Sequence, residues 1–123
     1  MTDIKEAQNS KILSDAVVKG MTEKKASDVL LMDLTNIGNA VADYFVICSG
    51  NSDTQIDAIA DSIEEEVYKA TSDHPWRKEG KENKEWILID YGNVVVHIFR
   101  KDRREFYSLE KLWGDAVITS IDA

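Results

Sequence analysis

Apolar residues recur at helical spacing in two stretches of the chain. Within residues 12–21 they fall three or four positions apart, which predicts an amphipathic helix that ends near Gly20. A second stripe predicts another helix, which begins after Ser52 because Ser52 and Gln55 have the spacing of a capping box. The members of the second stripe are Ile56, Ile59, Ala60, Ile63, Val67 and Ala70. Each helix has one apolar face, so each must pack against another element.

Longer apolar runs predict strands. Residues 28–34 and 43–48 form nearly continuous apolar runs, which are typical of strands covered on both faces. Residues 86–90 and 94–99 flank a three-residue segment, 91–93, that contains a glycine. This spacing favours an antiparallel hairpin.

Two weaker signals complete the pattern. A short extended piece is expected near residues 76–78, and apolar residues at helical steps in residues 106–113 predict a third helix. Together the elements predict an α+β fold, a mixed β-sheet of four or five strands flanked by helices. The length of 123 residues and the 43% hydrophobic content suit a single domain, residues 1–123, with termini that are flexible, including the tail 114–123.

Charge limits the class of partner. The chain has 23 acidic and 15 basic residues, a formal net charge of −8, and no basic arm. Binding by neutralisation of nucleic-acid phosphates is therefore disfavoured, and little direct nucleic-acid contact is expected. A basic protein partner fits better, because opposite fields speed encounter.

Composition also indicates a compartment. A lone cysteine, Cys48, excludes an internal disulfide framework and suits a reducing environment. No apolar run approaches the roughly 20 residues that span a bilayer, and the first twenty residues mix acidic with basic side chains, unlike a targeting peptide. We therefore expect a cytoplasmic protein without a membrane partner.

The candidates for catalysis are few. His97 lies inside an apolar run, which favours a core histidine over a general base, and His74 has no ligand partner at suitable spacing. Cys48 ends a buried strand and is expected to be inert. No phosphate-binding lysine loop or dinucleotide fingerprint is present. We therefore predict no enzyme activity, no metal and no cofactor.

The turn from Ser49 to Ser52 leaves one alternative open. It joins a strand to a helix N-terminus, which can hold a phosphate, and it resembles the Gly-Ser turn of nucleotidyltransferases. Those enzymes also need a close carboxylate pair on the next strand to bind two cations. The nearest match here is Asp90, which is followed by Tyr91, Gly92 and Asn93, so the pair is missing.

Aromatic and charged residues cluster near the hairpin. In an alternating strand Trp86, Leu88 and Asp90 share one face, and Tyr91 follows directly. Large aromatics beside a carboxylate are typical of protein–protein hot spots, so we expect a binding face here. Simple core packing of Trp86 is the alternative.

Several blocks of the sequence, in this order, resemble the Iojap family of ribosomal silencing factors, RsfS. The resemblance covers about residues 8–116, which we take as the core of the domain. The blocks are Lys25-Ala26-Ser27-Asp28-Val29, Ala42-Asp43-Tyr44-Phe45-Val46-Ile47-Cys48-Ser49-Gly50, Glu79-Gly80, Trp86-Ile87-Leu88-Ile89-Asp90-Tyr91-Gly92, Val94-Val95-Val96-His97-Ile98-Phe99 and Arg104-Glu105-Phe106-Tyr107-Ser108-Leu109-Glu110-Lys111-Leu112-Trp113.

The resemblance implies a nucleotidyltransferase-like fold without transferase chemistry, usually as a homodimer. It also implies binding to the large ribosomal subunit through its fourteenth ribosomal protein, which obstructs joining of the small subunit and represses translation. A dimeric adaptor with another protein target is a further alternative, and it predicts no affinity for ribosomes.

Matched motif positions imply a docking surface. Trp86 is expected to be its aromatic anchor and Asp90 to meet a basic side chain, with Tyr91, Tyr107 and Glu110 as further partner-binding residues. The chain departs from the family at Asn93, where members commonly have Asp. This difference removes a negative charge near the expected surface and is expected to weaken pairing with a basic partner.

Overall fold

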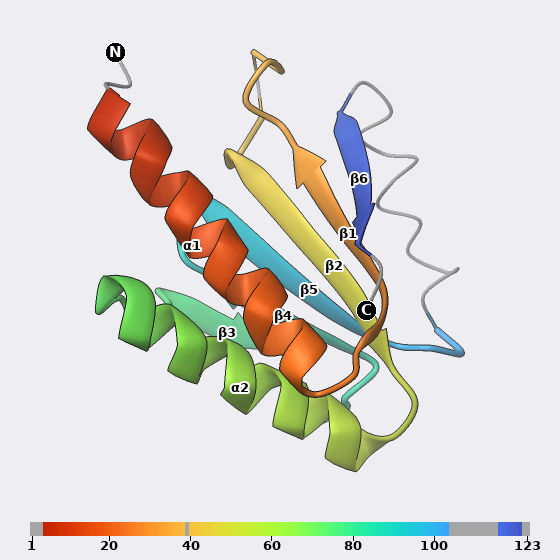
Figure 1. Ribbon diagram of the computed structural model, residues 1–123. Coiled ribbons are helices and arrows are strands. Elements are labelled where there is room, and N and C mark those ends of the chain that lie inside the picture. Colours follow the sequence, from red (N-terminus) through yellow and green to blue (C-terminus); the bar gives the residue numbers. More distant parts are fainter. Residues whose placement is uncertain (1–3, 39, 104–115, 122–123) are drawn as a thin grey trace.

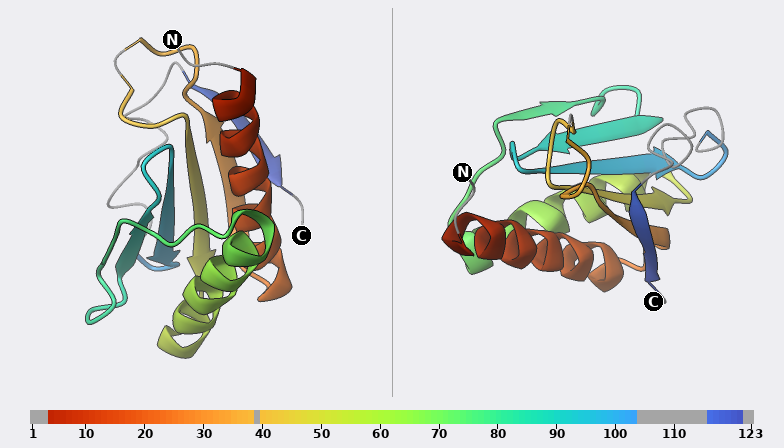
Figure 2. Two further views of the ribbon diagram at one scale, coloured as in Figure 1. Left: turned by 90° about the vertical axis from the view of Figure 1, so that its left-hand side faces the viewer. Right: turned by 90° about the horizontal axis from the view of Figure 1, so that it is seen from above.

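In the computed structural model, which describes residues 4–38, 40–103 and 116–121, two helices cover one face of a β-sheet (Figures 1 and 2). The sheet has six strands within the described residues, in the order β3-β4-β5-β2-β1-β6. The elements are α1 (Ile4–Glu23), β1 (Ser27–Asp33), β2 (Tyr44–Gly50), α2 (Asp53–Thr71), β3 (Arg77–Glu79), β4 (Trp86–Asp90), β5 (Val94–Arg100) and β6 (Val117–Ile121).

The strand pairing confirms a mixed sheet. β2 and β5 pair in parallel, whereas β1–β2, β3–β4, β4–β5 and β1–β6 are antiparallel. The hairpin expected around residues 91–93 is the β4–β5 connection. The expected four or five strands are too few, because β6 lies in the tail that was expected to be flexible. Four of its five residues are exposed, so this edge strand has no buried apolar run to reveal it.

Side chains alternate between two apolar clusters, one on each face of the sheet. Val46, Cys48 and Val96 point toward the helices, and Phe45, Ile47 and Val95 point away from them. The cluster on the helix side also includes buried residues of both helices, such as Val17 of α1 and Ile63 of α2. Figure 1 shows α1 in red to orange and α2 in green. Both faces of the central strands are therefore covered, as their continuous apolar runs predict.

Gly20 does not end the first helix as predicted. α1 continues to Glu23, and Gly20 is buried where α1 crosses α2. A Cβ atom at this position would lie 2.6 Å from the Cα of Ile63 and 2.9 Å from its backbone nitrogen. The glycine thus permits the backbones of the two helices to approach closely. The prediction of a helix end considered only the low helix propensity of glycine.

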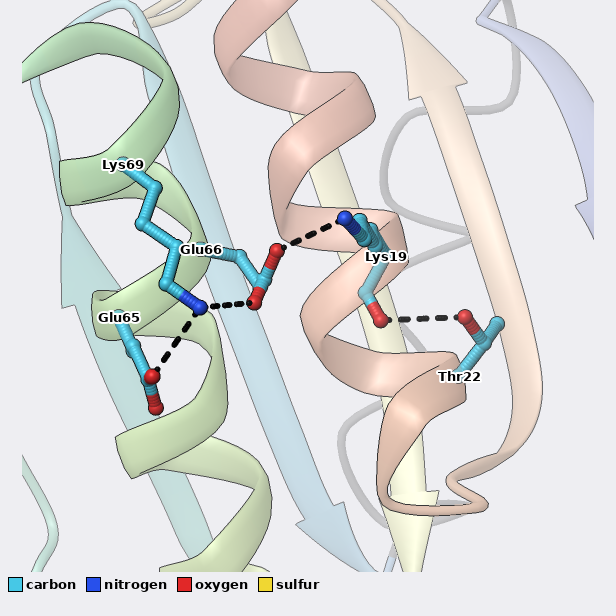
Figure 3. A network of polar contacts seen from close by, with 5 residues as sticks. All are labelled: Lys19, Thr22, Glu65, Glu66 and Lys69. Carbon is cyan, nitrogen blue, oxygen red and sulfur yellow. Dashed lines mark hydrogen bonds and ion pairs between the residues drawn. The ribbon is translucent and has the colours of Figure 1, made fainter.

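An ionic network ties the exposed sides of the two helices together (Figure 3). Glu66 of α2 lies 3.2 Å from Lys19 of α1 and 3.4 Å from Lys69, which also pairs with Glu65 at 3.2 Å. The hydrogen bond from Lys19 holds the pKa of Glu66 below its usual value. The lysines are largely exposed, so the network orients the helices more than it stabilises them.

Half of the predicted capping box is present at the start of α2, because Gln55 Oε1 accepts from Asn51 and not from the N-cap residue Ser52. The Gln55 backbone N–H donates to Ser52 Oγ at 3.1 Å, and the Asn51 N–H donates to Gln55 Oε1 at 2.6 Å. The Gln55 amide nitrogen also donates to the carbonyls of Lys24 and Lys25 at 3.2 and 3.1 Å. One side chain therefore joins the β2–α2 turn to the turn after α1.

Asn93 takes part in a partly buried chain of hydrogen bonds that joins α1 to the sheet. Its amide nitrogen donates to Ser10 Oγ at 2.7 Å, and the Ser10 hydroxyl donates to Asp43 Oδ2 at 2.7 Å. Ser10 is 1% exposed. A serine hydroxyl has one hydrogen, and Ser10 donates it to Asp43. The side chain at position 93 must therefore donate a hydrogen bond to Ser10 Oγ. An amide at position 93 meets this requirement and a carboxylate does not.

Asn93→Asp is accordingly expected to destabilise the protein by about 1–3 kcal/mol at pH 7, because two carboxylates would compete for one buried hydroxyl hydrogen. The crowded pair raises the folded-state pKa of one carboxyl above its unfolded value of about 4. The folded variant then binds a proton that the unfolded chain lacks, so the deficit shrinks as the pH falls from 7 toward that value. Urea unfolding of both proteins at pH 7 and pH 5 measures this. Equal stability at pH 7 would contradict the role assigned to the Asn93 amide.

Candidate docking pocket

A pocket of about 520 Å³ opens on the sheet face that the helices do not cover. We call it the open-face pocket. Its walls come from strands β2 to β5, from the β4–β5 turn and from the segments that precede β2 and β3. The lining residues are Val41, Phe45, Trp76, Arg77, Leu88, Asp90, Gly92, Val95 and His97. They include the expected partner residue Asp90, and they share the face on which Trp86 and Leu88 lie.

Two apolar side chains on the rim are strongly exposed. Trp76 is 84% exposed and Val41 is 72% exposed. The Trp76 backbone N–H donates to the carbonyl of Asp90 at 2.7 Å, which brings the segment before β3 against the end of β4. Exposed apolar groups beside a pocket with a few polar side chains are typical of a protein-docking surface.

Trp76 was not among the expected partner-binding residues. Its signal in the sequence is a tryptophan within the polar stretch 71–85, where the short extended piece expected near residues 76–78 has no other large apolar side chain. Such a residue has no packing reason to be there, which favours a role at the surface.

Asp90 is already engaged in the free protein. Its Oδ1 accepts from the Gly92 backbone N–H at 2.8 Å, and its Oδ2 lies 3.6 Å from Arg77 Nη2. The first bond stabilises the turn in which Gly92 has a φ of 89°. A basic group from a partner would therefore compete with Arg77, whose side chain is more than half exposed and able to move aside.

Trp86 is half-buried and packs within the sheet face. Its ring stacks on Phe99 with centroids 5.2 Å apart, and its indole N–H donates to His97 Nδ1 at 2.9 Å. These contacts support the alternative of core packing. Trp86 borders the pocket through His97 and does not line it.

His97 is 4% exposed, and its ring lies edge-on to Phe45 with centroids 5.0 Å apart. Burial lowers its pKa to about 4, and the nearby charge of Asp90 opposes this shift only in part. The imidazole is therefore neutral at pH 7. In the unfolded chain the imidazole is protonated below about pH 6.5, whereas in the folded protein it stays neutral down to about pH 4. Protonation therefore favours the unfolded chain, and this group reduces stability as the pH falls from about 6.5 toward 4.

The other expected partner residues are not in the pocket. Tyr91 is 6% exposed and belongs to the cluster on the helix side, where burial raises the pKa of its hydroxyl. Its ring is not available to a partner in this conformation. Tyr107, Glu110 and the predicted third helix lie outside the described residues.

The turn from Ser49 to Ser52 uses several of its polar groups in its own hydrogen bonds. The Asn51 N–H donates to Gln55 Oε1. Ser52 accepts two hydrogen bonds, from the Gln55 N–H at its side-chain oxygen and from the Ile56 N–H at its carbonyl oxygen. Asp90 pairs with Val95 at the start of β5, whereas Gly50 pairs with Arg100 at its end. Asp90 and this turn thus lie at opposite ends of the sheet. Across the described ranges, no three His, Cys, Asp or Glu side chains gather as metal ligands.

Comparison with known proteins identifies the family of the chain. The family model "Ribosomal silencing factor during starvation" (RsfS) matches residues 7–123. The chain belongs to the RsfS family. It is 42% identical to the ribosomal silencing factor RsfS of Bacillus subtilis over 114 residues, which cover 93% of this chain and 95% of that protein.

Two proteins with lower sequence identity are also similar to this chain. The chain is 32% identical over 101 residues to the mouse protein named mitochondrial assembly of ribosomal large subunit protein 1, covering 80% of this chain and 44% of that one. A crystal structure of a Chromobacterium violaceum protein superposes with a TM-score of 0.76 at 30% identity, covering 83% of each chain. The names of the Bacillus subtilis and mouse proteins describe silencing of ribosomes and assembly of the large ribosomal subunit. Among the described residues, neither helix is long and apolar enough to cross a membrane.

Proposed function

We propose that this RsfS-family protein binds the large ribosomal subunit through its fourteenth ribosomal protein and blocks joining of the small subunit, so that translation is repressed. It would act in the cytoplasm, as a homodimer when free. Steric obstruction needs no catalysis, cofactor or metal. It needs volume at the contact face and enough affinity to outlast the competing subunit.

The open-face pocket is the observation that carries this proposal. Trp76 and Val41 offer exposed apolar area at its rim, and Asp90 offers a carboxylate to a basic protein. The net charge of −8 disfavours ribosomal RNA as the main contact and favours a basic ribosomal protein. We assign Trp86 a supporting position behind the pocket, through its hydrogen bond to His97.

Co-sedimentation of the purified protein with separated large subunits, small subunits and joined ribosomes tests this function. We expect retention on large subunits at moderate salt, no retention on small subunits, and loss of joined particles when the protein is added before the subunits are mixed. Failure to sediment with large subunits would overturn the proposal. Retention without loss of joined particles would leave binding but refute the steric block.

A further inference from the structure

The imidazole of His97 is a polar group of the open-face pocket that the free protein leaves half satisfied. Nδ1 accepts the hydrogen bond from Trp86, but Nε2 has an accessible area below 1 Å² and no hydrogen-bond partner within the described part of the chain. A buried polar atom in this state is uncommon, and leaving it unpaired is unfavourable. A ligand that supplied the missing partner would gain from it.

The bond from Trp86 determines which nitrogen of His97 holds the proton. An indole N–H can only donate, so Nδ1 must be the unprotonated acceptor. The ring is neutral at pH 7, because burial lowers its pKa. The proton therefore resides on Nε2, which is a hydrogen-bond donor. The rings of Phe45 and Phe99 flank the imidazole, with interplanar angles of 67° and 9°, and hold it in this orientation.

The surroundings of this donor indicate what can occupy the pocket. Leu88 and Val95 provide aliphatic walls, and the two charged lining residues, Arg77 and Asp90, pair with each other. An anionic ligand is disfavoured by the acidic chain, and a fully apolar one would leave Nε2–H unpaired. A peptide segment meets both requirements, since a neutral backbone carbonyl lies beside every aliphatic side chain.

We propose that the open-face pocket takes an aliphatic side chain from a segment of the protein partner, and that His97 Nε2–H donates a hydrogen bond to a backbone carbonyl of that segment. The identity of the partner rests on the proposed function, whereas the chemistry of the pocket does not. Nε2 is shielded in the free protein, so the groups that cover it must shift on binding, as interface side chains commonly do.

A small peptide mimic tests the pocket without ribosomes. The full chain is titrated with N-acetyl-leucine N-methylamide at millimolar concentration, and NMR follows the His97 Nε2–H proton and the Leu88 methyl groups. We expect both signals to shift together, with the N–H proton moving downfield. Absence of a shift at either group would overturn the proposal.

Two substitutions separate hydrogen bonding from packing. His97→Gln can still accept from Trp86 and donate into the pocket, so its affinity for the mimic and for large subunits should stay within about threefold of the wild type. His97→Met has similar bulk but no donor, and its affinity should fall about tenfold or more. Wild-type affinity of His97→Met would overturn the proposal.

Stability must be controlled, because His97→Met removes the acceptor of the Trp86 N–H. The double variant Trp86→Phe/His97→Met removes both partners of that bond, and melting temperatures identify which variants are folded. The folded double variant should bind as weakly as His97→Met, and wild-type affinity would overturn the proposal. If the wild type does not bind large subunits, the proposed function fails, while the mimic titration still decides the chemistry of the pocket.

Discussion

Trp76→Ala is expected to weaken binding to the large subunit about 30-fold, equivalent to about 2 kcal/mol, as removal of an aromatic hot spot does. The melting temperature should change little, because a side chain that is 84% exposed contributes little to the core. Co-sedimentation at several protein concentrations measures the affinity, and thermal unfolding measures the stability.

Tyr68→Ala is the matched control for this change. Tyr68 is also an exposed aromatic residue, at 51%, but it lies on α2 and packs against His74, with ring centroids 4.9 Å apart. Affinity should be unchanged in this variant. Equal losses in both variants, or full affinity in Trp76→Ala, would show that the partner does not dock at the open-face pocket.

Gly20→Val is expected to lower the free energy of unfolding by about 3 kcal/mol, at the upper end for overpacked sites. The new side chain must begin 2.6 Å from the Cα of Ile63, and backbone cannot rotate away as a side chain can. The two helices must separate, which loosens the cluster beneath them. For a chain of this size the melting temperature should fall by about 10 °C.

The same substitution at Gly38 is the control. A Cβ atom there meets nothing within 4 Å, so Gly38→Val should leave the melting temperature within a few degrees of the wild type. If Gly20→Val were as stable as Gly38→Val, the helices would not depend on close approach at Gly20.

The centre of the sheet could be predicted because its strands are buried on both faces. In β2 and β5 this burial produces uninterrupted apolar runs, and the cap of α2 depends on only two residues, Ser52 and Gln55. Gly20 and β6 were missed for opposite reasons. Gly20 is explained by Ile63, which lies 43 positions away on another helix, and β6 is held mainly by backbone pairing that leaves no periodic pattern.

The site residues that could be predicted from the sequence are those that follow the alternation of side chains along a strand. Alternation places Trp86, Leu88 and Asp90 on one face, as the structure confirms. The same alternation places Tyr91 on the opposite face with Ile87 and Ile89, so the expectation that Tyr91 belongs to the binding face was wrong. Trp76 reaches the pocket through its backbone hydrogen bond to Asp90 and the β3–β4 pairing that follows it, which no spacing rule reports.

The position of β6 has a consequence for folding during synthesis. β1 pairs with β6 along Val29–Asp33, although residues 34–116 are translated between them. Until β6 is made, one edge of β1 has unpaired N–H and C=O groups that can recruit strands from other chains. The nascent chain can thus form its helices and inner strands early, but it protects this edge of β1 from aggregation only after residues 117–121 have been made.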